Sequence, residues 1–237
     1  MSPAHKEVAS MTRIYRDFSR PDPTLIARIG AIPTADLCDC AGPVAVGGAI
    51  RPVVEGSFAG PALTVRVTPG DNLMVHAALE LAQPGDVVVV DGGGCTDRAL
   101  LGALTVSCLR RQGVAGIVVD GAVRDTEALR AMGVPIYAGA VCPNGPTRTE
   151  GGAVNTPVTI GGRAVRPGDI VAADADGVVI LTPAQAEDAA EKARALADRE
   201  DAALERIVTD GAFPRPWLAG ALEAMDCRYG DLWEEET

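Results

Sequence analysis

The most distinctive hydrophobic pattern in the chain is a run of four valines at 87–90, which follows a Pro-Gly-Asp turn. An uninterrupted apolar run of this length is typical of a strand that is buried on both faces of a sheet. Three glycines follow, then helical spacing over 102–112, then a second apolar run at 117–119. A strand, a helix and a strand within about 30 residues predict a βαβ unit.

The connections of this unit carry its polar residues. We expect residues 95–101 to form a loop or a first helical turn, and residues 120–125 to form the loop after the second strand. The latter loop ends in Arg124 and Asp125, beyond the carboxyl end of a buried strand, where α/β proteins place ligands. Along the helix, the spacing predicts three inward-facing side chains: Leu104, Cys108 and Leu109.

Weaker patterns complete an α/β fold. Short β runs in the last third flank Gly161-Gly162 and Asp176-Gly177, which predicts antiparallel hairpins. Apolar spacing and turn residues predict the other elements: helices at 24–29, 33–41 and 72–82, and a strand at 62–67.

The carboxyl-terminal part is expected to be one long helix and a tail. Thr182, Pro183 and Gln185 form a helix-start signal, and the helical spacing continues to about Val208. We therefore divide the chain into an N-terminal arm at 1–23, a core at 24–181 and a C-terminal helix and tail at 182–237. The last part is thin in apolar residues, so we expect it to lie at a subunit interface.

Composition narrows the classes of function. The net charge of −11 argues against nucleic-acid binding, because such surfaces need clustered lysine and arginine. No apolar run approaches a membrane span, and the first twenty residues lack the apolar region of a signal peptide. The six cysteines form no Cys-x-x-Cys pair, so we expect reduced thiols in a cytoplasmic protein. With only two histidines, any metal is expected to be a hard cation held by oxygen.

Arg124 and Asp125 are the candidate reactive pair. A carboxylate in that loop can hold a divalent cation, and a guanidinium beside it can stabilise an enolate or a carboxylate. The glycines at 92–94 and the helix start at Gly102 offer backbone N–H groups to an anion. These parts suffice for metal-assisted enolate chemistry on a small oxo acid. An Arg-Asp dipeptide in a loop is, however, more often an exposed surface pair that contributes little.

Two further polar features have both a structural and a functional interpretation. Asp36 and Asp39 lie three residues apart on a predicted helix, either as solvated carboxylates or as a wall of the active site. His76 lies on the apolar stripe of the 72–82 helix. We expect it to be a half-buried histidine whose hydrogen bonds are satisfied, rather than a functional group.

Three segments resemble the class II pyruvate aldolase family: PGDNLMVHAALELAQPGDVVVVDGGG, GIVVDGAVRD and RPGDIVAADADGVVI. That family includes 4-hydroxy-4-methyl-2-oxoglutarate and 4-carboxy-4-hydroxy-2-oxoadipate aldolases, and its sister proteins are the RraA regulators of ribonuclease activity. The resemblance covers roughly residues 24–210. It implies an RraA-like swivelling β/β/α domain with a βαβ core, antiparallel C-terminal hairpins and a long C-terminal helix. It also implies homotrimers or homohexamers with active sites between subunits.

The resemblance also assigns roles to individual positions. Asp125 matches the residue that holds Mg²⁺ or Mn²⁺, and Arg124 matches the arginine that contacts the pyruvyl oxygen. The stretch Gly102, Ala103, Leu104 and Thr105 matches the helix start whose backbone binds the substrate carboxylate. Glu200 falls near an acidic residue that a neighbouring subunit contributes. The relatives usually carry Asp or Glu where this chain has Ala103, and Asp97, Asp120 or a partner's carboxylate are the candidates to replace it.

The implied activity is that of a divalent-metal-dependent lyase. It would cleave a 4-hydroxy-2-oxo acid to pyruvate through an enolate, and decarboxylate oxaloacetate as a side activity. Two alternatives stay open. One is a non-catalytic binding protein like the RraA regulators, and the other is a family member that acts on a different oxo acid because of Ala103.

Overall fold

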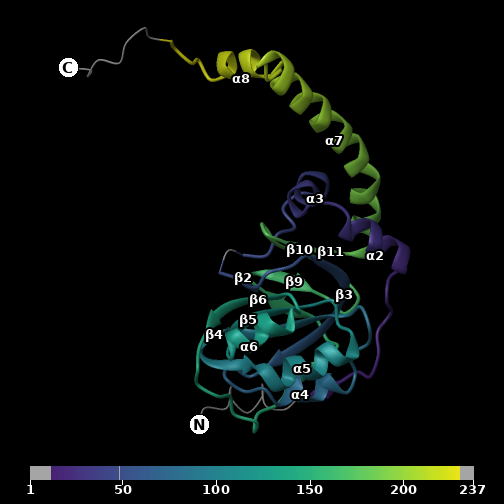
Figure 1. Ribbon diagram of the computed structural model, residues 1–237, viewed down its shortest axis with the longest axis vertical. Coiled ribbons are helices and arrows are strands. Elements are labelled where there is room, and N and C mark those ends of the chain that lie inside the picture. Colours follow the sequence, from purple (N-terminus) through teal and green to yellow (C-terminus); the bar gives the residue numbers. More distant parts are fainter. Residues whose placement is uncertain (1–11, 48, 230–237) are drawn as a thin grey trace, which may run out of the picture. The chain divides into compact units, whose positions relative to one another are not determined.

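The computed structural model describes residues 12–47 and 49–229 of the chain. At its centre lies a parallel sheet in the order β3-β4-β5-β6 (Figure 1). Its strands are β3 (Phe58–Val67), β4 (Val87–Leu101), β5 (Gly116–Val123) and β6 (Ile136–Val141). Three strands extend it: β2 (Arg51–Val54) antiparallel to β6, β7 (Gly152–Val154) antiparallel to β3, and β1 (Arg13–Ile14) parallel to β7.

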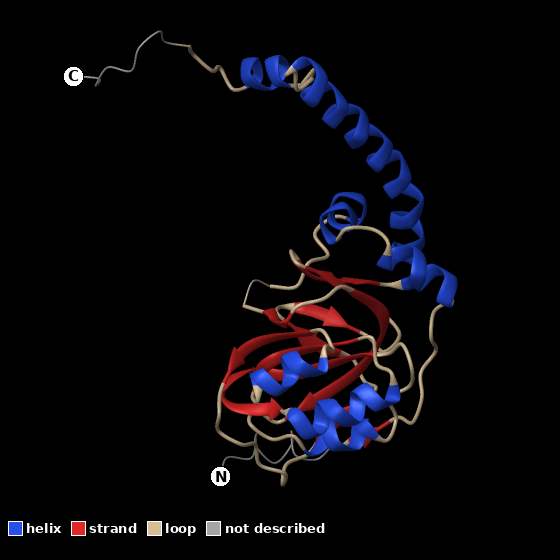
Figure 2. Ribbon diagram, in the orientation of Figure 1, coloured by secondary structure: helices blue, strands red, loops and turns tan. Residues whose placement is uncertain are grey.

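One face of the parallel sheet is covered by helices (Figure 2). They are α4 (Leu73–Leu79), α5 (Ala103–Gln112) and α6 (Thr126–Met132), and each connects two successive parallel strands. Val88 and Val90 of β4 belong to the same buried cluster as Val106 of α5 and Leu129 of α6. The predicted βαβ unit, with α5 as its helix, is therefore confirmed.

The other face of the sheet is covered by short antiparallel strands. These are β8 (Val158–Ile160) with β9 (Arg163–Val165), and β10 (Ile170–Asp174) with β11 (Gly177–Leu181). Val87 and Val89, which alternate with the helix-facing valines, cluster here with Ile160 and Ile180. Both faces of the four-valine strand are thus buried, and the predicted β/β/α arrangement with antiparallel hairpins is confirmed.

A third apolar cluster holds the two first helices, α2 (Pro23–Gly30) and α3 (Thr34–Ala41), to the β10–β11 hairpin. Asp22 caps α2, since its carboxylate accepts the Thr24 N–H at 2.7 Å. Thr34, at the start of α3, donates from its backbone N–H and its hydroxyl to the Asp174 carboxylate, at 2.8 and 2.6 Å.

The strands β4 and β5 are longer than their apolar runs, which is where the sequence prediction was wrong. Residues 95–101 and 120–123 are strand rather than loop. The β4–β5 register jumps after Asp91, and β4 resumes pairing at Cys95, Ala99 and Leu101. The glycines made the bulge possible: Gly93 and Gly94 have φ of 62° and 69°, a region that favours glycine. The chain therefore leaves the ladder and returns to it with three buried residues, 99–101.

The prediction for the inner face of α5 was also partly wrong. Leu109 is buried as expected, but Leu104 is 85% exposed and Cys108 is exposed. The buried side chains of the helix are Thr105, Val106 and Leu109. The helical period was predicted correctly, but the buried face was assigned to the wrong residues. The end of β4 sets the direction in which the helix begins, and so which of its residues face the core.

The chain divides into two compact units, one ending at Ala193 and the other beginning at Arg194. Helix α7 (Pro183–Asp210) contributes to both, and α8 (Leu218–Ala224) lies in the second. In the first unit, α7 buries Ala186, Ala189 and Ala193. In the second unit the described apolar side chains are largely exposed, with Val208 at 83%. The predicted domain limits at 23 and 181 stay predictions. Among the described residues, no helix has the length and apolar character needed to span a membrane.

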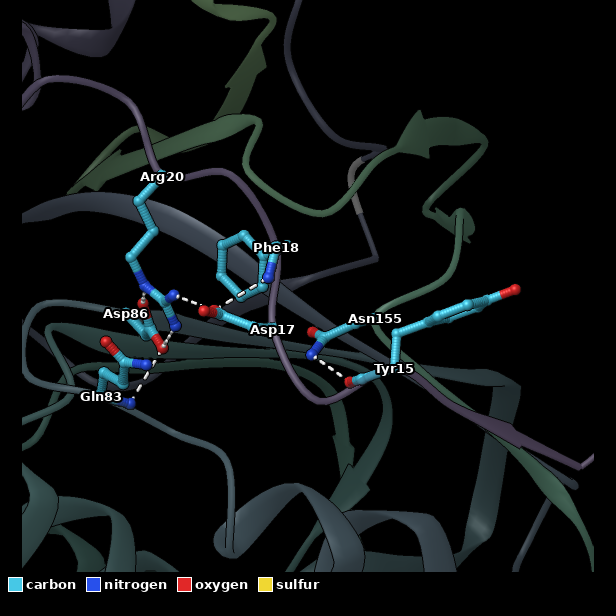
Figure 3. A network of polar contacts seen from close by, with 7 residues as sticks. All are labelled: Tyr15, Asp17, Phe18, Arg20, Gln83, Asp86 and Asn155. Atoms are coloured by element: carbon cyan, nitrogen blue, oxygen red, sulfur yellow. Dashed lines mark hydrogen bonds and ion pairs between the residues drawn. The ribbon is translucent and has the colours of Figure 1, made fainter.

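The segment that leads into α2 is tied to the amino end of the parallel sheet (Figure 3). The Arg20 guanidinium donates from two nitrogens to the two carboxylate oxygens of Asp86, both at 2.8 Å. Asp86 belongs to the Pro-Gly-Asp turn before β4, and its side chain is fully buried. The Asn155 amide donates to the carbonyl of Tyr15 at 2.8 Å. Part of the predicted arm, residues 1–11, lies outside the described residues.

Candidate active site

A pocket of about 110 Å³ lies where β4 and β5 end. Its lining includes Arg124 and Asp125, which follow β5, and Gly102, Leu104 and Thr105, which follow β4. Four other predicted site residues therefore lie in one pocket with Arg124: Gly102, Leu104, Thr105 and Asp125. Ala103 takes part through its backbone, as described next. The volume is several times what one water molecule needs, so it has room for a small organic acid.

Asp125 is held in a defined orientation at the pocket. Its backbone has φ of 62°, which is uncommon for a residue other than glycine, and it precedes the first turn of α6. Its Oδ2 accepts the backbone N–H of Ala103 at 2.9 Å. A Cβ atom at Gly102 would lie only 2.5 Å from the same oxygen, so this close approach requires glycine. The position of Asp125, the second residue of the Arg-Asp dipeptide, is thus fixed by the fold.

Arg124 crosses the pocket between two glycines. A Cβ at Gly102 would lie 3.1 Å from its Cγ, and a Cβ at Gly145 would lie 3.1 Å from its Nη1. The Nε atom is 3.9 Å from Asp125 Oδ2, with the two side chains 38% and 44% exposed. So long a contact between half-exposed groups contributes little to stability. The two glycines leave space for the Arg124 side chain. An ion pair on an open surface would not need such space.

The start of α5 provides a floor of backbone N–H groups. The Gly102 N–H donates to the Thr105 hydroxyl oxygen at 3.1 Å, and that hydroxyl donates to the Gly102 carbonyl at 2.9 Å. The Ala103 N–H is taken by Asp125. In any α-helix the first N–H groups have no intrahelical acceptor, so those of Leu104 and Thr105 remain for a ligand. They carry the positive end of the helix dipole, which favours an anion such as a carboxylate.

A second set of polar residues lines the same pocket and was missed in the sequence. Asn72, just before α4, is 3% exposed, and its amide nitrogen donates to the Leu100 carbonyl at 3.0 Å. His76 of α4 is half-buried, as expected, but its buried Nε2 has no hydrogen-bond partner among the described residues. The expectation of a satisfied histidine was therefore wrong. One signal in the sequence could have pointed to this pair. Asn72 and His76 are four residues apart, which puts them on one face of a helix that follows a parallel strand.

The loop that carries Arg148, another lining residue, is held by a buried carboxylate. Asp71, 1% exposed, accepts the Leu73 N–H at 2.8 Å, the Thr149 N–H at 2.7 Å and the Thr147 hydroxyl at 2.9 Å. Burial, the largest single influence, raises the pKa of Asp71, but these hydrogen bonds together outweigh it and the pKa is lowered. Asp71 thus joins the start of α4 to the Arg148 loop as an ionised carboxylate.

The donor set suits one kind of metal. Asp125 is the one carboxylate among the described lining residues, and no group of three or more His, Cys, Asp or Glu side chains gathers in the described ranges. A caged zinc ion needs such a group. Mg²⁺ and Mn²⁺ accept one carboxylate and fill the remaining positions with water and substrate oxygens. A hydrated hard cation at Asp125 therefore fits the residues that are present.

Asp97, Asp120 and the glycines at 92–94 are not part of the described lining of this pocket. Asp97 and Asp120 are engaged elsewhere, Asp97 by the Cys95 thiol and Asp120 by the Gly161 N–H, and neither is part of the described lining. They therefore do not replace a carboxylate at Ala103. The glycines at 92–94 form the bulge of β4 rather than an anion site, and Asp36 and Asp39 lie on α3. Glu200 lies in the second unit, so its role stays a prediction.

Comparison with known proteins agrees with this fold. The family model described as RraA-like, Aldolase/RraA, matches residues 34–180. A protein of Halalkalibacterium halodurans, provisionally named 4-hydroxy-4-methyl-2-oxoglutarate aldolase, is 37% identical over 194 residues, covering 81% of this chain and 92% of its own.

Solved structures give the same family. Streptomyces coelicolor RraAS2, described as an unusual member of the RNase ES inhibitor RraA family, superimposes with a TM-score of 0.72 and 31% identity. The match covers 78% of this chain and 98% of that one. The RNA-processing inhibitor RraA of Thermus thermophilis superimposes with a TM-score of 0.59 and 37% identity, covering 63% and 92%. With a matching family model over most of its core and these relatives, the chain belongs to the RraA-like family, which holds both aldolases and RraA proteins.

Proposed function

We propose that the protein is a divalent-metal-dependent lyase that cleaves a 4-hydroxy-2-oxo acid to pyruvate through an enolate. The observation that carries the proposal is the joint placement, in one pocket, of a guanidinium, a carboxylate and the amino end of helix α5. The aldolase name of the Halalkalibacterium relative supports the reaction class. Mg²⁺ or Mn²⁺ is the expected cofactor, because Asp125 is the one carboxylate in the described lining and these cations fill their other positions with water and substrate oxygens.

Each residue has a role in this reaction. The N–H groups of Leu104 and Thr105 bind the substrate carboxylate, and the Arg124 guanidinium faces the keto oxygen. A Mg²⁺ or Mn²⁺ ion at Asp125 would supply Lewis-acid polarisation of that keto group. Asp125 itself is kept in place by the Ala103 N–H and by the absence of a side chain at Gly102.

The bond changes follow from that placement. A base takes the proton of the 4-hydroxyl, the C3–C4 bond breaks, and C4 leaves as a carbonyl compound. The electron pair of the broken bond remains on the three-carbon fragment as an enolate, whose oxygen Arg124 stabilises. A proton added to the enolate carbon gives pyruvate. Oxaloacetate, which loses CO₂ to reach the same enolate, is the expected side substrate.

The base that takes the 4-hydroxyl proton does not come from the described lining of the pocket. Ala103 offers no carboxylate, and Asp97 and Asp120 are engaged elsewhere. We propose that Glu200 of a neighbouring subunit serves, in a homotrimer or homohexamer with its sites between subunits. Light scattering tests this arrangement, and a monomer that is fully active would contradict it.

The decisive experiment measures pyruvate release from 4-hydroxy-4-methyl-2-oxoglutarate and from oxaloacetate, with Mg²⁺, Mn²⁺ or EDTA. We expect release with either metal, loss of release with EDTA, and loss in Asp125→Ala. Activity that survives both EDTA and Asp125→Ala would overturn the metal-enolate proposal.

The second candidate is a non-catalytic RraA-like binding protein, which the names of the solved relatives favour. It predicts that neither compound yields pyruvate with any metal, while the folded protein still inhibits an RNA-processing ribonuclease. The same pyruvate assay therefore separates the two candidates.

A further inference from the structure

Two residues that line the pocket each carry a buried polar atom that the proposed chemistry does not use. These atoms are the Asn72 Oδ1 and the His76 Nε2, and neither has a hydrogen-bond partner among the described residues. Buried polar atoms without partners are rare in folded proteins and each one requires an explanation. Because both residues line one pocket, a bound ligand is the simplest partner for both.

The orientation of Asn72 limits what that ligand can be. Its amide nitrogen donates to the Leu100 carbonyl at 3.0 Å, which leaves the Oδ1 atom as the unpaired group. An amide oxygen only accepts, so its partner must bring an N–H or O–H. A carboxylate or keto oxygen of a substrate cannot serve, since those atoms are acceptors as well.

His76 can supply a hydrogen-bond donor beside the Asn72 acceptor. It follows Asn72 by four residues, and its backbone N–H donates to the Asn72 carbonyl at 3.2 Å, so the two side chains share a face. A neutral imidazole nitrogen that carries hydrogen donates a hydrogen bond. One acceptor and one donor side by side match a group that both donates and accepts, which is the property of a hydroxyl.

We infer that Asn72 and His76 form a subsite for the hydroxyl group of the substrate. In the bound substrate, before the base takes its proton, the hydroxyl donates to the Asn72 Oδ1 and accepts from the His76 Nε2–H. The inference rests on the proposed function and deepens it, because it assigns the selectivity for hydroxylated oxo acids to two residues of α4 and its cap. A site with buried groups set to bind a hydroxyl discriminates strongly against ligands without one, because those groups are then left unpaired.

The test compares two substrates that share the enolate and differ in the hydroxyl. The readout is the ratio of kcat/KM for 4-hydroxy-4-methyl-2-oxoglutarate cleavage to kcat/KM for oxaloacetate decarboxylation, in the full chain with Mg²⁺. Asn72→Leu and His76→Phe keep roughly the shape of each side chain and remove the hydrogen bond. We expect each to lower the ratio about 10- to 100-fold, since the lost bond affects only the hydroxylated substrate.

Gln112→Met is the matched control. The Gln112 amide also donates to a backbone carbonyl, that of Leu79, and its Oε1 is also buried without a partner, but Gln112 is not part of the pocket lining. The control should leave the ratio as it is in the unmodified protein. Circular dichroism and thermal unfolding of every variant establish that it is folded, and the two pocket variants serve as replacements for each other if one does not fold.

The outcomes separate this inference from the proposed function. An unchanged ratio in a folded Asn72→Leu and a folded His76→Phe overturns the hydroxyl subsite while the lyase proposal stands. A ratio that falls equally in Gln112→Met overturns it as well, because the effect would then come from altered packing. An unmodified protein that releases pyruvate from neither compound overturns both proposals.

Discussion

Two buried polar sites at opposite ends of the parallel sheet differ in how their groups are paired. At the amino end, the buried Asp86 carboxylate is closed by the Arg20 guanidinium and by the Gln83 N–H at 2.9 Å. At the carboxyl end, Asn72 Oδ1 and His76 Nε2 are left without partners among the described residues, and Arg124 meets Asp125 only at 3.9 Å. The paired Asp86 carboxylate is suited to stabilising the fold, whereas the unpaired groups that line the pocket are available to bind.

The largest expected effect is on activity, at the carboxyl end. Arg124→Ala should lower kcat for pyruvate release about 100- to 1000-fold, because it removes the group that stabilises the enolate oxygen. The melting temperature should change little, since the arginine makes only a long, half-exposed ion pair. Steady-state kinetics and calorimetry measure the two effects. Arg130→Ala, on the exposed part of α6, is the control, and an equal loss of kcat there would remove the contrast.

The next effect is on stability, at the amino end. Arg20→Met leaves the Asp86 charge buried without its partner and should lower the free energy of unfolding by about 3 kcal/mol. Urea unfolding measures it. The kcat of the folded variant should match the unmodified protein, because neither residue lines the pocket. Asp17, which also binds Arg20 at 2.6 Å but is exposed, provides the control Asp17→Asn, with no measurable change expected.

A smaller effect on stability is expected at the carboxyl end, beside the pocket. Asp71→Asn weakens the hydrogen bonds that hold the Arg148 loop and should cost about 1–2 kcal/mol of unfolding free energy at neutral pH. The pKa of Asp71 is lowered from 3.8, so its contribution is present above pH 3.8 and is lost as the pH falls through the lower, folded-state pKa. Hydrogen exchange at 147–150 should accelerate in the variant. Unchanged exchange would mean that the loop is held by its backbone contacts alone.

The smallest effect has the opposite sign and concerns an exception at the amino end. Asp169 precedes β10 in a second Pro-Gly-Asp turn, and burial raises its pKa above 3.8, partly offset by the hydrogen bond from the Arg166 N–H. The folded state therefore holds a proton more tightly than the unfolded state, so stability falls as the pH rises from 3.8 through the folded-state pKa. Asp169→Asn should remove that pH dependence and slightly raise the free energy of unfolding at neutral pH. A loss of stability at pH 7 would contradict it.

The local sequence was sufficient for some of these features. Four consecutive valines predicted a strand buried on both faces, and Gly161-Gly162, with φ of 50° and 81°, predicted a hairpin. Both depend on neighbouring residues alone. Arg124 and Asp125 were placed at the pocket by the rule that ligands bind at the carboxyl ends of strands, together with the family resemblance.

Other features depend on contacts between distant residues. The bulge of β4 exists because 99–101 find partners on β5 after the chain has left the ladder. The unpaired state of Asn72 Oδ1 depends on which group takes its amide nitrogen, the Leu100 carbonyl 28 residues away. The direction in which α5 faces was set by the end of β4, which moved Leu104 from the expected core to the surface. Spacing alone does not contain that information.

The excursion of β4 between Asp91 and Cys95 also makes the chain tolerant of changes in length. Pairing with β5 resumes at Cys95↔Gly121 and continues through Ala99↔Ala122 and Leu101↔Val123. Gly93 and Gly94 are exposed, and surface turns accept insertions at a modest entropic cost. A fluorescent tag or an affinity peptide grafted between these two glycines would therefore report on the pocket from nearby, while Asp97 and Arg98 keep their contacts with residues 142–145.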